Sequence, residues 1–235
     1  MIGIIDSGMG GLSTLATLIH AKADHQFLYY ADVLHAPYGN KGQWDIYKAI
    51  KTCIHTLCGY GVDQIVIACN TASFAALSAC QEEFSLPIYG VLPSVDEAKE
   101  AGGTTLLLAT AYTTSQPFPR EIVPVALPSL ATLVDLYYPY QMEPILSYLE
   151  RELSGYNGIE NVVLGCTHYE LIGEEIRSIL RANRTFYGSN SILRQLKKAT
   201  PGTGWQLDIL SSGSIDHERY SDVLSLLLDR QSNLR

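Results

Sequence analysis

The chain alternates short runs of aliphatic and β-branched residues with longer segments of helical periodicity, and this alternation constrains its fold most. It is typical of repeated βα units, which build a parallel sheet with helices on both faces. We predict strands at 2–5, 26–31, 64–68, 88–91, 104–109, 161–164 and 207–210. We predict helices at 12–21, 45–60, 73–84, 142–153, 173–184 and 218–227. The expected fold class is therefore α/β and doubly wound.

One segment of the chain is echoed 97 positions later. Residues 63–71 and 160–168 both read as an acid, an amide, three aliphatics, a small residue, a cysteine and two polar residues. The echo predicts two similar α/β domains with the active site in the cleft between them. We place the first domain at 1–95 plus 206–235 and the second at 96–205.

The echoed cysteines, Cys69 and Cys166, each follow a predicted buried strand by one small residue, Ala68 or Gly165. In open α/β sheets, ligands bind at the carboxyl ends of the strands. A single cysteine in such a place is more often a packing residue than a functional one. Two cysteines in matched contexts favour a functional pair facing each other across one cleft.

Two thiols suit the inversion of an amino-acid α-carbon, because one proton must leave one face and another must arrive on the opposite face. A free thiol titrates near ~8.5, and acid–base catalysis is most efficient when the pKa lies near the working pH. Asp6, at the end of the first strand, and His168, two residues after Cys166, are positioned to adjust the two thiols.

Three further features could hold a small polar ligand. The glycine-rich turn at residues 6–12 offers backbone N–H groups to an anion, and it could equally be a tight turn with no ligand. Its glycines do not match the dinucleotide spacing, and it lacks the lysine of a P-loop. Pro37, Tyr38 and Gly39 form a turn that presents an aromatic hydroxyl. Uncharged hydrogen-bonding groups are available, and Thr71 or Thr167 could instead cap a helix: Asn70, Thr71, Thr113 and Thr167.

Composition excludes several classes of protein. The net charge of −8, with no clustered Lys and Arg, argues against a nucleic-acid partner. No apolar run approaches a membrane span and no signal-peptide pattern opens the chain, so we expect a cytoplasmic protein with no membrane partner. Five cysteines, an odd number, are then reduced thiols. Cys53 and Cys58 lack a second ligand pair at zinc spacing and are interpreted as core residues, so we expect no metal.

Four segments resemble, in order and spacing, the glutamate racemases of the aspartate/glutamate racemase superfamily. They are residues 6–12, 37–39, 68–73 and 165–169. A weaker likeness at residues 212–213 and in the last predicted helix implies that the end of the chain returns to complete the first domain. The resemblance implies a cofactor-independent isomerase that converts L-glutamate to D-glutamate for peptidoglycan synthesis and cell shape. It also implies a bacterial, cytoplasmic enzyme, and it is compatible with a homodimer.

The resemblance also implies roles for individual residues. Cys69 would deprotonate the D-substrate and Cys166 the L-substrate, with Asp6 and His168 assisting the two thiols. The remaining family positions would hold the amino acid; they are Ser7, Pro37, Tyr38, Gly39, Asn70, Thr71, Thr113 and Thr167.

The chain departs from the family pattern in places outside the thiol pair. It is shortened between residues 115 and 134, and Gly188 falls where the family usually has an acidic residue. Asp135 replaces a common glutamate, and residues 34–36 are unusual.

Three alternative functions remain open from the sequence. An aspartate or other amino-acid racemase would keep the thiol pair, although the residues that follow Cys166 favour glutamate. A non-catalytic binding paralogue would need neither cysteine, and nor would it need Asp6 or His168. A phosphate-binding hydrolase would need a lysine or metal-binding acid beside the glycine-rich turn, and the sequence shows neither.

Overall fold

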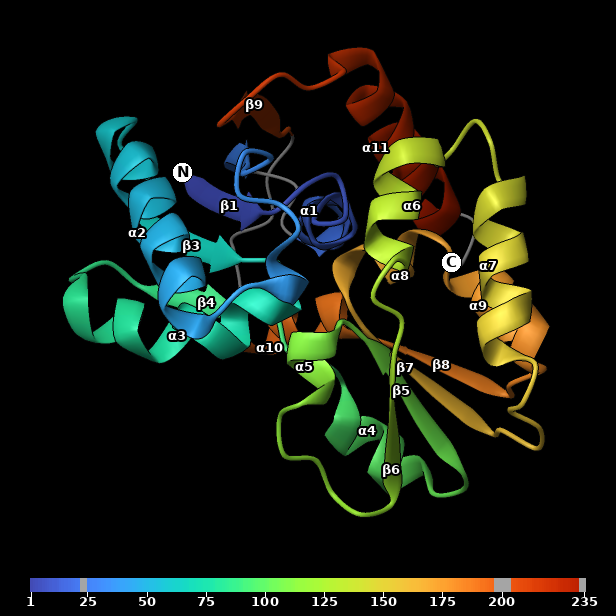
Figure 1. Ribbon diagram of the computed structural model, residues 1–235. Helices are drawn as coiled ribbons and strands as arrows, with labels where there is room; N and C mark the ends of the chain where they lie inside the picture. Colours follow the sequence, from blue (N-terminus) through green and yellow to red (C-terminus); the bar gives the residue numbers. More distant parts are fainter. Residues whose placement is uncertain (22–24, 197–203, 233–235) are drawn as a thin grey trace.

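The computed structural model describes residues 1–21, 25–196 and 204–232, and it contains two parallel sheets (Figure 1). The first sheet has the order β4-β3-β1-β2-β9 and the second the order β6-β5-β7-β8. The strands of the first are β1 (Ile2–Asp6), β2 (Gln26–Ala31), β3 (Gln64–Ile67), β4 (Ile88–Gly90) and β9 (Gln206–Ser211). Those of the second are β5 (Thr105–Ala109), β6 (Ile122–Ala126), β7 (Asn161–Gly165) and β8 (Arg184–Tyr187).

Helices connect the strands and cover the sheets. In the first half of the chain they are α1 (Leu12–Ala21), η1 (Tyr38–Asn40), α2 (Gln43–Gly59), α3 (Asn70–Glu83), α4 (Val95–Ala101) and α5 (Ala111–Thr114). In the second half they are α6 (Leu130–Tyr137), α7 (Glu143–Leu153), α8 (Thr167–Leu171), α9 (Gly173–Leu180), η2 (Gly188–Asn190), α10 (Ser191–Gln195) and α11 (His217–Ser232).

The central strands are the most apolar segments of the chain, as a sheet buried on both faces requires. All five residues of β1, β5 and β7 are buried. Every strand pair is parallel, so the carboxyl ends of each sheet share one edge. β9 pairs with β2 although it follows the whole second sheet, and α11 packs on α1. The chain therefore crosses to the second sheet and returns to complete the first. On this basis we propose the division at 95/96 and 205/206 as the domain boundaries.

The predicted α/β class is confirmed, with two sheets as expected. The predicted helix at 173–184 is too long, because α9 ends at Leu180 and Arg181 adopts the left-handed conformation (φ 51°). That turn frees Arg184 to begin β8, which the sequence analysis missed. β6 was also missed; it is an edge strand that carries Pro124, a residue that edge positions tolerate.

The structure corrects one interpretation of the cysteines. Cys53 is buried in the core beneath the first sheet, whereas Cys58 is exposed. All five cysteines are free thiols.

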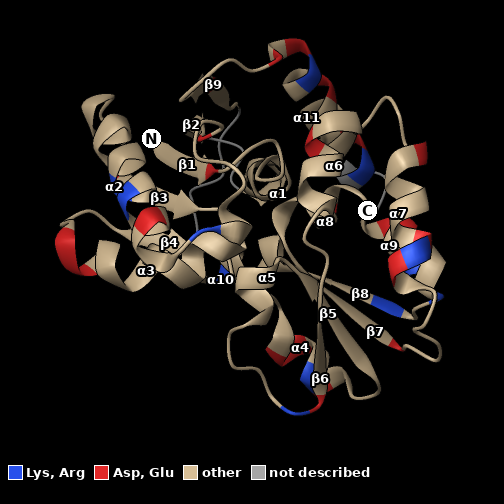
Figure 2. Ribbon diagram, in the orientation of Figure 1, with Lys and Arg blue, Asp and Glu red and all other residues tan. Residues whose placement is uncertain are grey.

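No helix in the described part of the chain is long and apolar enough to cross a membrane. Lys and Arg are scattered over separate helices and loops, and the ribbon shows no continuous basic stripe in this view (Figure 2).

Candidate active site

A small cavity of about 20 Å³ lies where segments from the carboxyl ends of both sheets meet. The loops that follow β1, β3, β5 and β7 contribute to its wall, as does the turn that contains η1. Its volume holds about one water molecule. The lining residues are Ser7, Pro37, Tyr38, Gly39, Asn40, Cys69, Asn70, Thr71, Thr110, Pro128, Ala131, Cys166 and His168.

Cys69 occupies the N-cap of α3, directly beyond β3. Burial raises the pKa of this thiol well above its usual range, and the nearby Asp6 and Cys166 raise it further. The backbone N–H groups of Thr71 and Ala72, at the start of the helix, act in the opposite direction and favour the thiolate. The resting form of Cys69 is therefore the thiol, with hydrogen-bond donors already placed for the thiolate.

Cys166 occupies the matching N-cap of α8, beyond β7, and its neighbour is a histidine. The Cys166 Sγ lies 4.0 Å from Nδ1 of His168. On the opposite side of the ring, Nε2 of His168 donates to Oδ2 of Asp135 at 3.0 Å. Burial disfavours the charged imidazole, but the Asp135 carboxylate and, after it, Cys166 outweigh that effect, so the pKa of His168 is raised well above its usual range. Cys166 thus lies beside a ring whose charged form is favoured, whereas Cys69 is subject to the opposing charge of the Asp6 carboxylate.

Asp6 joins the two sheets from behind the cavity wall. Its side chain is fully buried, Oδ1 accepts the N–H of Gly8 at 3.0 Å, and Oδ2 accepts the Thr167 hydroxyl at 3.0 Å. Burial raises the pKa of this carboxyl, and His168, Gly8 and Thr167 oppose that effect. Asp6 therefore holds the loop that carries Cys166 and Thr167, the second cysteine loop, against β1. Because its pKa is raised, Asp6 can also exchange a proton more readily than an exposed aspartate can.

The N–H groups of the glycine-rich turn are partly taken by the protein's own carboxylates. Gly8 donates to Asp6, and Met9 donates to Oδ1 of Asp135 at 3.3 Å. The glycines let the second cysteine loop approach. A Cβ on Gly10 would lie 2.6 Å from the backbone nitrogen of His168. The turn thus serves close packing between the sheets, in addition to presenting Ser7 to the cavity.

The Tyr38 hydroxyl does not point free into the cavity, although the side chain lines it. It donates to Oδ2 of Asp32 at 2.5 Å, and Asp32 is only 1% exposed. Nδ1 of His35 contacts the same carboxylate at 2.8 Å. This cluster fixes the turn that contains η1 against the first sheet.

Three threonines form a hydrogen-bonded group at the junction of the two sheets. The Thr71 hydroxyl lies 2.8 Å from that of Thr110 and 3.2 Å from that of Thr113. Thr110 also caps α5 by accepting the N–H of Thr113. Thr71 and Thr110 line the cavity, whereas Thr113 is buried behind them.

The structure brings most of the predicted site residues to the cavity wall. The exceptions, Asp6, Thr113 and Thr167, do not line the cavity and are buried behind its wall. The sequence analysis did not assign Asn40, Thr110, Pro128 or Ala131 to the site. Thr110 could have been found, because it directly follows a predicted strand. Asp135 was noted only as a departure from the family pattern, yet it is the partner of His168. Within the described ranges, no three His, Cys, Asp or Glu side chains gather as a metal site would require.

The chain is similar to glutamate racemases in sequence and in fold. A glutamate racemase from Clostridium perfringens (strain SM101) is 31% identical over 231 residues, which cover 92% of this chain and 88% of that protein. The crystal structure of glutamate racemase from Thermus thermophilus in complex with β-chloro-D-alanine has 28% identity and a TM-score of 0.79, covering 96% of this chain and 92% of that one.

Glutamate racemase from Campylobacter jejuni has 25% identity and a TM-score of 0.81, covering 97% of this chain and 98% of that one. The family model described as Asp/Glu/Hydantoin racemase matches residues 2–124. The chain therefore belongs to the Asp/Glu/hydantoin racemase family of enzymes.

Proposed function

We propose that this enzyme interconverts L- and D-glutamate by proton transfer between two thiols, with no cofactor. One observation carries the proposal: Cys69 and Cys166, which follow strands of different sheets, line the same cavity. The names of the similar proteins support glutamate as the substrate.

The proposed reaction needs one thiolate and one thiol at a time. With D-glutamate, the Cys69 thiolate takes the α-proton, and the Cys166 thiol delivers its own proton to the opposite face. The product is L-glutamate, and the two cysteines have exchanged protonation states. The reverse reaction begins at Cys166. Asp6 accepts the proton when Cys69 ionises, and the charged His168 stabilises the Cys166 thiolate at 4.0 Å.

The amino acid would be held by uncharged groups on both sides of the α-carbon. Ser7, Asn70 and Thr71 line the cavity from the first sheet, as does the turn at 37–39, and Thr110 lines it from the second sheet. Thr113 and Thr167 are buried behind the cavity wall and would help to position Thr71 and Asp6, to which they are hydrogen-bonded. Because the cavity of about 20 Å³ holds about one water molecule, its walls must separate to admit the substrate.

The biological part of the proposal is that the D-glutamate supplies peptidoglycan synthesis in the bacterial cytoplasm. We keep a homodimer as a prediction, which light scattering on the purified protein tests.

Incubating the dialysed protein with L-glutamate in deuterated water tests the reaction. We expect the circular dichroism signal of glutamate to decay to zero while deuterium enters the α-position. Activity that is lost on dialysis and recovered only with pyridoxal phosphate would refute the two-thiol mechanism. Faster racemisation of L-aspartate than of L-glutamate would refute the substrate assignment and leave the mechanism standing.

A further inference from the structure

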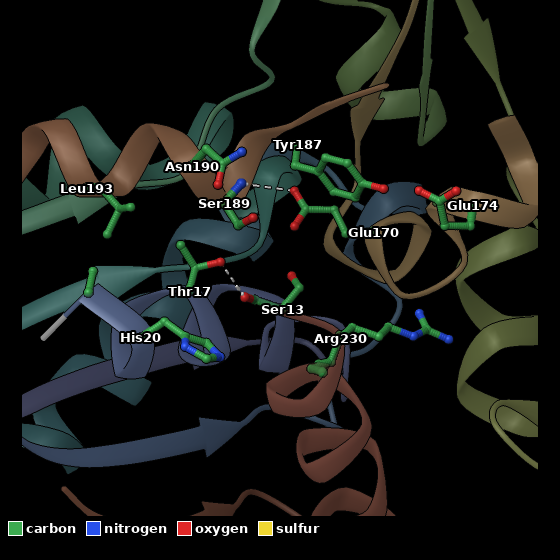
Figure 3. A pocket seen from close by; sticks show the side chains of 13 residues that line it. Ser13, Thr17, His20, Glu170, Glu174, Tyr187, Ser189, Asn190, Leu193 and Arg230 are labelled. Atoms are coloured by element: carbon green, nitrogen blue, oxygen red, sulfur yellow. Dashed lines mark hydrogen bonds between the residues drawn. The ribbon is translucent and has the colours of Figure 1, made fainter. Parts of the chain in front are cut away.

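A second cavity, of about 680 Å³, lies on another side of α8 and shares no lining residue with the thiol cavity. Figure 3 shows side chains from α1, α8, α10 and α11 converging on it. The volume is in the range that binds small organic molecules. Its lining combines apolar groups, such as Ala21, Leu193 and Leu227, with a few charged ones.

Glu170 places a carboxyl group in the wall of this cavity. The residue is only 5% exposed. Oε1 accepts the N–H of Ser189 at 2.9 Å, which ties α8 to the turn after β8. Among the described residues, Oε2 has no hydrogen-bond partner. Burial raises the pKa of this carboxyl, and Ser189, Ser13 and the backbone of Gly188 only partly oppose that effect. The Ser13 hydroxyl itself makes no hydrogen bond to Oε2. A cationic donor at Oε2 would therefore favour the charged form of Glu170.

Two basic side chains that line the cavity each have a backbone carbonyl as a partner. Nη1 of Arg230 donates to the carbonyl of Leu171 at 3.0 Å, and Nε2 of His20 lies 3.2 Å from the carbonyl of Leu228. No described Lys, Arg or His nitrogen lies within ion-pair distance of Glu170. A buried carboxylate oxygen without a partner costs free energy that a donor in the cavity would recover.

We propose that this cavity binds a small molecule with a protonated primary amine on an apolar body, the ammonium group pairing with Oε2 of Glu170. Its apolar body would lie against Leu193 and Leu227. Because α8 carries both Glu170 and His168, occupancy of the cavity is expected to change turnover. That expectation, unlike the binding itself, rests on the proposed racemase function.

The probe is 2-phenylethylamine, with neutral 2-phenylethanol as its matched analogue, and binding is followed by ligand-observed NMR near neutral pH. The variants are Glu170→Gln, which keeps an acceptor for Ser189, and the control Glu174→Gln at the exposed rim. We expect the amine to bind the unmodified protein and the control alike, and Glu170→Gln at least about tenfold more weakly. The alcohol should bind all three proteins equally.

Leu193→Trp, which narrows the cavity without touching the carboxyl, should also abolish amine binding. Equal amine affinity for the unmodified protein and Glu170→Gln would overturn the inference, as would binding that Leu193→Trp leaves unchanged. The NMR measurement needs no turnover. Failure of amine binding in an active racemase, or binding in an inactive one, therefore separates this inference from the proposed function.

Discussion

The sharpest test of the architecture is Gly10→Ala, which adds one methyl group between the two sheets. The new Cβ would lie 2.6 Å from the backbone nitrogen of His168 and 2.6 Å from Oγ1 of Thr167. A backbone atom cannot rotate away as the end of a flexible side chain can. The start of α8, and with it Cys166, must therefore shift.

The size of the shift follows from van der Waals contact. An ordinary Cβ contact begins near 3.4 Å, so the loop must retreat by about 0.8 Å. A displacement of about 1 Å at a catalytic group costs on the order of 10²-fold in rate. Overpacking of this kind costs about 1–3 kcal/mol of stability. We therefore expect kcat/KM for glutamate to fall roughly 10²-fold, which corresponds to about 2.7 kcal/mol.

Racemisation followed by circular dichroism gives kcat/KM, and urea unfolding gives the change in stability. The matched control is Gly59→Ala at the end of α2, where a Cβ would meet nothing within 4 Å. The control should retain full activity. If Gly10→Ala kept kcat/KM within twofold of the unmodified enzyme, the close approach of the turn to His168 would have no catalytic importance.

Three further predictions concern the groups around the thiols. Cys69→Ser and Cys166→Ser should each abolish racemisation while retaining elimination of HCl from one enantiomer of threo-3-chloroglutamate. Elimination should be lost with the D-substrate in Cys69→Ser and with the L-substrate in Cys166→Ser. Racemisation at the normal rate by either variant would exclude the mechanism. Asp135→Asn should lower the pKa of His168 in an NMR titration. The raised pKa of His168 contributes stability that is complete below about pH 6.5 and is lost as the pH rises through the folded-state value; urea unfolding at pH 6 and 9 should therefore differ less in Asp135→Asn than in the unmodified protein. Because burial raises the pKa of Asp6, its ionised form destabilises the fold above about pH 4; Asp6→Asn should keep or raise the melting temperature while activity falls about 10²- to 10⁴-fold, and a lower melting temperature with normal activity would contradict the assigned role.

The strongly patterned parts of the fold could be predicted from the sequence. Central strands such as β1 and β7 are continuous aliphatic runs, and their limits were predicted to within a residue. The edge strands β6 and β8 were missed because their residues are only partly buried, so selection for apolar side chains is weak there. The return of β9 to the first sheet followed from the resemblance to the racemases, since no local pattern encodes it.

The site could be predicted where its residues follow strands. Cys69 and Cys166 each follow a strand, and ligands bind at the carboxyl ends of the strands in a parallel sheet. The positions of Asp135 and Asp32 could not be predicted in this way. Each is a carboxylate from a separate element that contacts the site through one partner, His168 or Tyr38. Such pairs depend on how distant elements pack, which residue spacing does not reveal.

The unequal surroundings of the two thiols have a limited kinetic consequence. Cys69 lies near the Asp6 carboxyl and Cys166 near His168, so the two thiols have different electrostatic surroundings. L- and D-glutamate nevertheless have equal free energies in water. The ratio of kcat/KM in the two directions must therefore equal one at every pH and in every variant. The asymmetry can appear only in kcat and KM taken separately. We therefore expect Asp135→Asn, which weakens the charge on His168, to change the two kcat values unequally. Equal proportional changes in both would mean that His168 does not distinguish the two thiols.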